Sequence, residues 1–254
     1  MKHFVIIRLG NKQNDIKHFK EYLPDKSTID TICEAFAGSF SVIRNIYFDC
    51  KNIICSENDL NFRNQINSIF SNLDEYNKEK QFVNDFITNP KYLKDNGYFD
   101  RDKYKFVLVN QLKYLKMPDI ANRGIFKKQP TKIKYDELKI LYDKIKWYDD
   151  FKEVFELLKN NEKAFVFLDP PYFQSNNKNY EGSNKFDENK NVIDNTNIYI
   201  DIFEFMKSCK CKVMLIVNKS KLIHYMYKEF YKNEYNKIYG GSKNKEILMI
   251  YCNY

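Results

Sequence analysis

The sequence predicts an α/β protein with a doubly wound, mostly parallel sheet and a helical insert. Two observations predict this fold: short apolar runs that each lead into a helical pattern, and a middle region whose apolar residues recur at helical spacing. The 254 residues suit one domain with an insertion. A hydrophobic fraction of 43% is sufficient for a packed core, which excludes wholesale disorder.

The apolar runs are typical of strands buried on both faces of a parallel sheet. The expected strands, in chain order, are residues 31–35, 52–57, 144–148, 164–168, 212–217 and 246–251. Residues 182–197 are rich in Asn, Ser and Lys without periodicity, so they are expected to form a loop.

The helical insert is expected between the second and third strands. Its apolar residues, such as Ile66, Ile69 and Phe70, recur at helical spacing, and the prolines at 90 and 118 interrupt the pattern. The predicted domains are therefore 1–61 with 142–254 for the sheet, and 62–141 for the insert.

Positive charge is concentrated in the middle of the chain. The formal net charge is +8, and residues 62–147 hold 18 basic and 11 acidic residues. Residues 101–134 alone hold ten basic and two acidic residues, interleaved with aromatic ones. Such a segment is an electrostatic footprint for nucleic acid. In a chain this rich in lysine, a solvated helical face is the other interpretation.

Other classes of protein are not indicated. No apolar run approaches the roughly 20 residues that cross a bilayer, and the basic first residues lack an apolar stretch with a cleavage site. We therefore expect neither membrane insertion nor secretion. The three histidines and six cysteines lack ligand-like spacing, so no metal site is expected.

A candidate catalytic motif follows the strand at 164–168. Asp169, Pro170, Pro171 and Tyr172 come directly after it, at the edge where ligands bind in open α/β sheets. The prolines fix φ and remove N–H donors, so the turn offers oxygen acceptors beside the Asp169 carboxylate. Such acceptors suit a planar amine, and a flipped adenine would present its 6-amino group there while Tyr172 stacks on its ring.

This tetrapeptide resembles the catalytic motif of the Dam-like family of DNA adenine-N6 methyltransferases. The order of motifs is similar to the alpha group of that family: cofactor motif first, then a helical recognition insert, then Asp-Pro-Pro-Tyr. The resemblance implies a Rossmann-like methyltransferase sheet, S-adenosylmethionine as cofactor and a target-recognition role for the insert. It implies catalytic roles for Asp169, Pro170, Pro171 and Tyr172.

The resemblance also implies the cofactor contacts. Lys12 would bind the cofactor's carboxylate, Asp59 its ribose hydroxyls, and Asp150 its adenine amine beside Phe151, while Asp169 borders the same site. The alternatives are an ordinary surface lysine at position 12 and helix caps at the two other aspartates. Glu57 is a weaker candidate than Asp59, because strand alternation would point it away from this edge.

Residues 34–42 resemble the family's Glu-Pro-Phe-x-Gly-x-Gly turn, which implies that Phe36 and Gly38 contact the cofactor. Phe40 stands where the second glycine is usual. If that position needs a positive φ, Phe40 is strained. Its ring is then expected either against the methionine part of the cofactor or partly filling the cofactor pocket.

Nucleic-acid contacts are expected from the insert and from the loop after the catalytic motif. Arg123 lies in a stretch similar to the family's recognition region and would bind a phosphate or a guanine edge, or be a plain surface arginine. The expected contact residues are Lys103, Lys105, Lys113, Arg123, Lys127, Lys128 and Tyr180.

The predicted function is site-specific methylation of adenine N6 in double-stranded DNA, with base flipping, by a monomer or a weak dimer on DNA. The resemblance implies a cytoplasmic protein of a bacterium or phage, or one found where viral DNA is replicated, in the context of restriction-modification. Two alternatives stay open. One is a catalytically impaired DNA-binding protein with a methyltransferase fold, and the other is a methyltransferase of RNA or of the cytosine 4-amino group.

Overall fold

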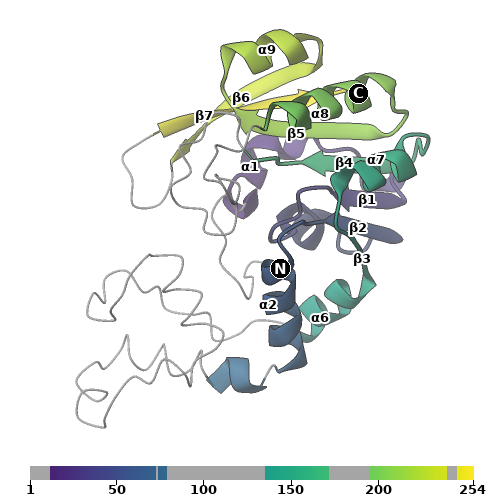
Figure 1. The fold of residues 1–254 in the computed structure, drawn as a ribbon, viewed down its shortest axis with the longest axis vertical. Coiled ribbons are helices and arrows are strands. Elements are labelled where there is room, and N and C mark those ends of the chain that lie inside the picture. The colour runs from purple at the N-terminus through teal and green to yellow at the C-terminus, as the bar shows by residue number, and fades with distance from the viewer. Residues whose placement is uncertain (1–11, 73, 79–134, 172–194, 239–244) are drawn as a thin grey trace, which may run out of the picture.

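The computed structural model describes residues 12–72, 74–78, 135–171, 195–238 and 245–254 (Figure 1). Within them lies a seven-stranded sheet of order β3-β2-β1-β4-β5-β7-β6. The strands are β1 (Thr31–Glu34), β2 (Asn52–Ser56), β3 (Ile145–Tyr148), β4 (Ala164–Leu168), β5 (Lys212–Asn218), β6 (Tyr231–Ile238) and β7 (Lys245–Cys252). The first five pair in parallel, and β7 is antiparallel to both β5 and β6. The predicted doubly wound, mostly parallel sheet is confirmed.

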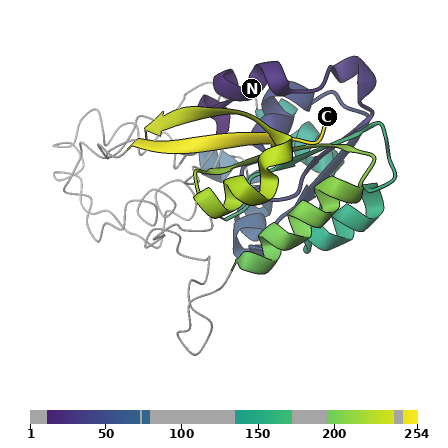
Figure 2. The same cartoon turned by 90° about the horizontal axis from the view of Figure 1, so that it is seen from above.

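Helices cover both faces of this sheet. Figure 2 shows α7, α8 and α9 on one face and α1 on the other. The α-helices include α1 (Ile16–Phe19), α2 (Leu60–Ser71), α6 (Tyr135–Lys144), α7 (Phe151–Leu158), α8 (Thr196–Ser208) and α9 (Lys221–Tyr227), and residues 74–78 are helical as well. The shorter turns are η1 (Lys12–Asn14), η2 (Lys20–Tyr22), η3 (Lys26–Thr28), the π-helical η4 (Ile43–Tyr47) and η7 (Lys228–Phe230). The result is a three-layer architecture.

Strand alternation divides the core into two apolar clusters. On β4, Phe165 and Phe167 face the cluster that contains α1, η4, α2 and α6. Val166 and Leu168 face the other cluster, with α7, α8 and α9. Because both faces are covered, β4 is buried at every position, which is why it was predictable as a continuous apolar run.

Strand β6 is the element that the sequence pattern did not predict. It forms an edge of the sheet and pairs with β7 through Tyr235 and Leu248, among others. Its sequence, YKNEYNKI, lacks an apolar run. This fits its place in the structure, where Lys232 and Asn236 are exposed while Tyr235 and Lys237 are buried. An edge strand needs only alternating burial, and polar residues protect its exposed side.

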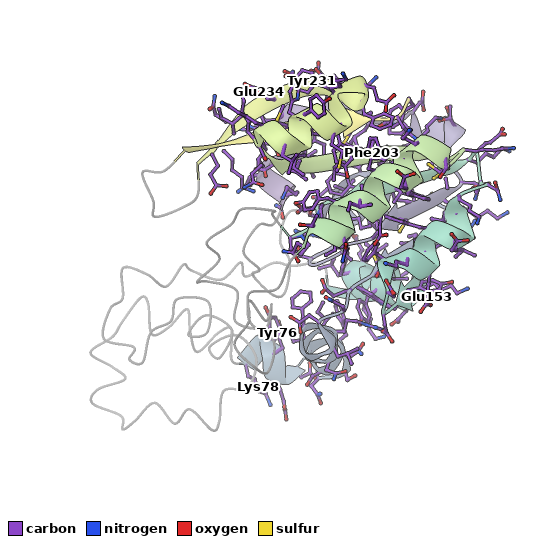
Figure 3. All side chains as sticks on the ribbon, turned by 45° about the horizontal axis from the view of Figure 1, so that its top comes forward. Tyr76, Lys78, Glu153, Phe203, Tyr231 and Glu234 are labelled. Atoms are coloured by element: carbon purple, nitrogen blue, oxygen red, sulfur yellow. The ribbon has the colours of Figure 1, made fainter. Side chains whose placement is uncertain are left out.

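The two ends of the predicted insert pack onto the sheet. Asp59 caps α2 by accepting the Phe62 N–H at 3.0 Å, and apolar residues of α2 and α6 join the same cluster as β1 and β4. Tyr76, seen beyond α2 in Figure 3, is buried there as well. Residues 79–134 lie outside the described part, so the boundaries of the insert stay a prediction. None of the helices in the described part combines the length and the apolar character that a membrane-spanning helix needs.

Candidate active site

The centre of the sheet contains a topological switch point. From β1 the chain continues to β2 and β3 on one side and later to β4 and β5 on the other, so β1 and β4 are neighbours. In open α/β sheets, ligands bind beyond the carboxyl ends of the strands at such a point. Asp169, Pro170 and Pro171 directly follow β4 there.

The turn after β4 is anchored by a hydroxyl from α8. The Tyr199 hydroxyl donates to the carbonyl of Pro171 at 2.9 Å, and the Tyr227 hydroxyl donates to the carbonyl of Tyr199 at 2.5 Å. Pro170 itself is buried. These bonds fix the turn against α8 and α9, so Asp169 projects from a rigid support. No local sequence pattern identified Tyr199 in this role.

Lys12 forms an ion pair with the motif's carboxylate. Its Nζ lies 2.5 Å from Oδ1 and 2.6 Å from Oδ2 of Asp169. The lysine is 2% exposed, while the Asp169 side chain is 21% exposed. Burial raises the pKa of Asp169, and the charge of Lys12 opposes that rise. The two residues were predicted separately, and the structure brings them into contact across 157 positions of sequence.

A second buried ion pair lies beside the first. Nζ of Lys237, on β6, is 2.5 Å from Oδ2 of Asp15, and the two side chains are 9% and 8% exposed. The Tyr235 hydroxyl is 3.5 Å from the same Asp15 oxygen. Neither member of this pair was a predicted site residue, because nothing in the local sequence links Asp15 to a strand 222 positions later.

Glu34 connects the end of β1 to the following helical turn. Its Oε1 accepts the Ile43 N–H at 2.6 Å. Burial raises its pKa to about 8, opposed by this hydrogen bond and by the nearby charge of Arg44. Arg44 is fully buried and its Nη2 donates to Gln13 at 2.7 Å. These contacts hold η4 against the end of β1 and against η1.

The turn between β1 and η4 contains two left-handed residues. Gly38 has φ 46° and Phe40 has φ 38°, and Phe40 is the one non-glycine residue with positive φ in the described part of the chain. Position 40 therefore does have a positive φ, which is the condition under which Phe40 is expected to be strained. Its ring is fully buried, and its centroid lies 6.3 Å from the ring centroid of Tyr142 and 6.3 Å from that of Trp147. The structure thus places the ring in the hydrophobic core with α6 and β3.

Phe40 gives a stability prediction with an unusual order of variants. Replacing it with Ala removes a buried ring, at a cost of about 3–5 kcal/mol, and keeps a left-handed residue with a Cβ. Replacing it with Gly relieves about 1 kcal/mol of backbone strain. We therefore expect Phe40→Gly to be more stable than Phe40→Ala in urea unfolding.

The control is Phe165, a fully buried residue in the middle of β4. Glycine loses more backbone entropy than alanine in an ordinary strand, so Phe165→Gly is expected to be less stable than Phe165→Ala. The same order at both positions would show that the backbone at Phe40 is unstrained.

Glu57 stabilises the glycine turn from the end of β2. Its Oε2 accepts the Gly38 N–H at 2.9 Å and its Oε1 accepts the Asp59 N–H at 3.0 Å. Glu57 is 7% exposed. The expectation that it points away from this edge was wrong, because Glu57 lies one residue beyond β2, where alternation no longer fixes its direction. Asp59 lies beside it and caps α2.

Two aromatic side chains meet above the ends of β1 and β3. The rings of Phe36 and Phe151 have centroids 5.0 Å apart, and both side chains are partly exposed. Asp150, which is exposed, accepts the Lys152 N–H at 2.9 Å and caps α7. The capping role weighed for Asp150 is therefore present in the structure, with Phe151 as the first residue of the helix.

The structure thus gathers the described predicted residues at one edge of the sheet. Lys12 contacts Asp169, Phe36 contacts Phe151, and Glu57 links Gly38 to Asp59. The predicted residues outside the described part are Tyr172, Tyr180, Lys103, Lys105, Lys113, Arg123, Lys127 and Lys128. Among the described residues, no group of three or more His, Cys, Asp or Glu side chains could hold a metal ion.

Comparison with known proteins agrees with this arrangement. A family model for the D12 class N6 adenine-specific DNA methyltransferases matches residues 9–240, which include the glycine turn, the two ion pairs and the Asp-Pro-Pro motif. A search of curated proteins gives no match. The family match confirms the predicted resemblance and the predicted reaction, methylation of adenine N6 in DNA. The chain therefore belongs to the D12 class N6 adenine-specific DNA methyltransferase family.

Proposed function

We propose that the methyl donor is S-adenosylmethionine and that Asp169 and the Pro170 carbonyl hold the 6-amino group of an adenine extruded from duplex DNA. The observation that carries the proposal is the position of Asp169 at the carboxyl end of β4, beside the switch point, with its turn anchored by Tyr199. An anchored carboxylate next to a carbonyl offers two acceptors for the two hydrogens of one amine.

The amine of adenine is a poor nucleophile because its lone pair is delocalised into the ring. Asp169 and the Pro170 carbonyl would draw its hydrogens out of the ring plane and localise the lone pair on nitrogen. The donor supplies an electrophilic methyl group on a sulfonium. As nitrogen gains positive charge in the in-line displacement, the methyl–sulfur bond breaks and a neutral thioether leaves. The Asp169 carboxylate stabilises the charge on nitrogen until the methylated amine loses a proton.

The residues at the strand ends fit S-adenosylmethionine. The Lys12 ammonium holds a carboxylate in this structure, that of Asp169, and the same ammonium can pair with the donor's carboxylate. Gly38 has no Cβ and a positive φ, which lets the backbone approach a ligand closely. The partly exposed rings of Phe36 and Phe151 offer apolar faces for an adenine.

We infer that the basic segment at 101–134 contributes the contacts to DNA. Its support is charge: ten basic residues against two acidic ones. Phosphate contacts of this kind release counterions, so binding to duplex DNA would weaken steeply as salt is raised. The six basic contact residues predicted from the sequence belong to this segment, and Tyr180 follows the catalytic motif in the sequence.

The proposal is tested by incubating the full chain with duplex DNA and tritiated S-adenosylmethionine, then digesting the product to nucleosides. We expect the label in N6-methyladenine. Label in 4-methylcytosine, transfer to RNA in preference to DNA, or salt-dependent DNA binding without transfer would overturn it. Methylation-sensitive long-read sequencing of DNA from expressing cells would then give the site that is recognised.

Glu57 offers a prediction for donor affinity. In Glu57→Gln one acceptor oxygen becomes an NH2 group, so either the Gly38 or the Asp59 N–H loses its bond to a charged acceptor. Such a bond contributes about 1.5 kcal/mol, so we expect the KM for S-adenosylmethionine to rise about tenfold. The matched control is Glu153→Gln on α7, an exposed position labelled in Figure 3, which should leave this KM unchanged.

A further inference from the structure

The Asp15–Lys237 pair is not accounted for by the roles proposed above. Lysine on an edge strand ordinarily stays in solvent, where its charge prevents edge-to-edge pairing. Lys237 instead is 9% exposed and ion-paired with a residue that precedes α1. Burying two charges is costly and often gives no net stability, so a purely structural role is a weak reason for the pair.

The pair lies next to the ion pair of the catalytic carboxylate, because the Asp15 N–H donates to the Lys12 carbonyl at 2.9 Å and the Lys12 ammonium contacts Asp169. Burial raises the pKa of Asp169, while the charges of Lys12 and Lys237 oppose the rise and that of Asp15 adds to it. Glu34, at the end of β1, interacts with Asp169 only weakly, and burial raises its pKa to about 8. Among the described residues, two cations and two carboxylates therefore meet here: Lys12 of η1, Lys237 of β6, Asp15 before α1 and Asp169 after β4.

The balance changes when the donor binds, an argument that rests on the proposed function. The Lys12 ammonium now contacts both oxygens of Asp169, which are acceptors that the adenine amine must reach. If Lys12 moves to the donor's carboxylate, Asp169 becomes free for the amine but loses the ammonium that contacts both its oxygens, while the donor's sulfonium carries its charge on the far side of the methyl group. A partly buried carboxylate with less positive charge beside it is protonated more readily, and a protonated carboxyl can no longer accept both the amine's hydrogen and its developing charge.

We propose that Lys237 is a positioning residue, held by Asp15, whose ammonium keeps Asp169 ionised once Lys12 has moved to the methyl donor. Lys237 lies on the edge strand β6, and its Nζ is held 2.5 Å from Oδ2 of Asp15. Lys237 thus acts on the reaction through Asp169 without contacting substrate, and Asp15 prevents it from forming a competing ion pair with the catalytic carboxylate.

The test measures kcat as a function of pH, because kcat reports the pKa of groups in the substrate-bound enzyme. Activity requires ionised Asp169, so kcat falls as pH decreases through its pKa. In Lys237→Gln, which keeps a donor to Asp15 but removes the charge, we expect this acid limb to move upward by about one pH unit. Lys237→Arg should restore it, and Lys232→Met, at an exposed position of β6, should leave it unchanged.

A second measurement needs no activity. In the ligand-free Lys12→Met protein, the Asp169 carboxyl can be titrated by 13C NMR and assigned with Asp169→Asn. Adding Lys237→Gln should raise its pKa by about one unit. Should that variant unfold, Asp15→Asn/Lys237→Gln removes both buried charges. Because Lys237 affects Asp169 more than Asp15 does, the double variant should shift the pKa upward by less.

The outcomes separate this inference from the proposed function. An active wild type with the same acid limb in Lys237→Gln, or an Asp169 titration that Lys237→Gln leaves in place, would overturn the inference and leave the function intact. If the wild type transferred no methyl group but the NMR titration gave the expected shift, the proposed function would be overturned. The effect of Lys237 on the ionisation of Asp169 would still be supported.

Discussion

Asp169→Asn is expected to lower kcat for adenine methylation by roughly 1,000-fold, the upper range for loss of one preorganised charge-stabilising group. Asparagine keeps one acceptor oxygen at a similar position but cannot stabilise the positive charge that develops on the amine. The measurement is single-turnover transfer of a labelled methyl group to duplex DNA at saturating donor. Methyl incorporation near the wild-type rate would refute the role assigned to Asp169.

The control for this variant is Asp143→Asn. Asp143 is also ion-paired, with Lys139 on the same helix at 2.6 Å, but it is 56% exposed and lies on α6. Because exposed pairs contribute little, we expect its kcat to equal that of the wild type. DNA affinity measured at fixed salt should be the same for both variants, which would assign the loss in Asp169→Asn to chemistry and not to DNA binding.

Features encoded in contiguous residues could be predicted from the sequence. β4 is an apolar run because both of its faces are buried, and Asp169 follows it directly. The caps formed by Asp59 and Asp150 were likewise recognisable, since each precedes an amphipathic helix. The sequence raised the question of strain at Phe40, because this residue stands where the resembled turn usually has glycine, and the structure shows a positive φ there.

Features that depend on tertiary contacts could not be predicted. The pairing of Asp15 with Lys237 joins residues 222 positions apart, and in a chain with 42 Lys and Arg no single lysine is conspicuous. The contact of Lys12 with Asp169 also depends on where the sheet brings two separate motifs. β6 was missed because an edge strand with polar residues has no apolar run to mark it.

Lys12→Met gives the second large effect, because Lys12 is proposed to serve two carboxylates. Loss of a charged hydrogen bond of about 1.5–3 kcal/mol to the donor should weaken S-adenosylmethionine binding by roughly 10- to 100-fold, measured by isothermal titration calorimetry. The variant should also lose about 3 kcal/mol of unfolding free energy at pH 7, because it leaves the partly buried Asp169 carboxylate without its partner.

This loss of stability is expected to depend on pH in a definite direction. Without Lys12 the pKa of Asp169 in the folded state rises further above its value in the unfolded chain, since burial already raises it. A carboxyl with a raised folded-state pKa destabilises the protein as pH increases through that pKa, so Lys12→Met should regain stability relative to the wild type as pH is lowered. Urea unfolding at several pH values measures the difference.

Two further variants decide whether the effect belongs to this ion pair. In Lys12→Met/Asp169→Asn no buried charge of the pair remains, so we expect most of the lost stability at pH 7 to return and its pH dependence to disappear. Lys26→Met removes a lysine that is 44% exposed and pairs with Asp49 at 2.9 Å, and it should cost less than about 1 kcal/mol. If the double variant were as unstable as Lys12→Met, the loss would come from packing of the lysine side chain, and the two-carboxylate role of Lys12 would rest on donor binding alone.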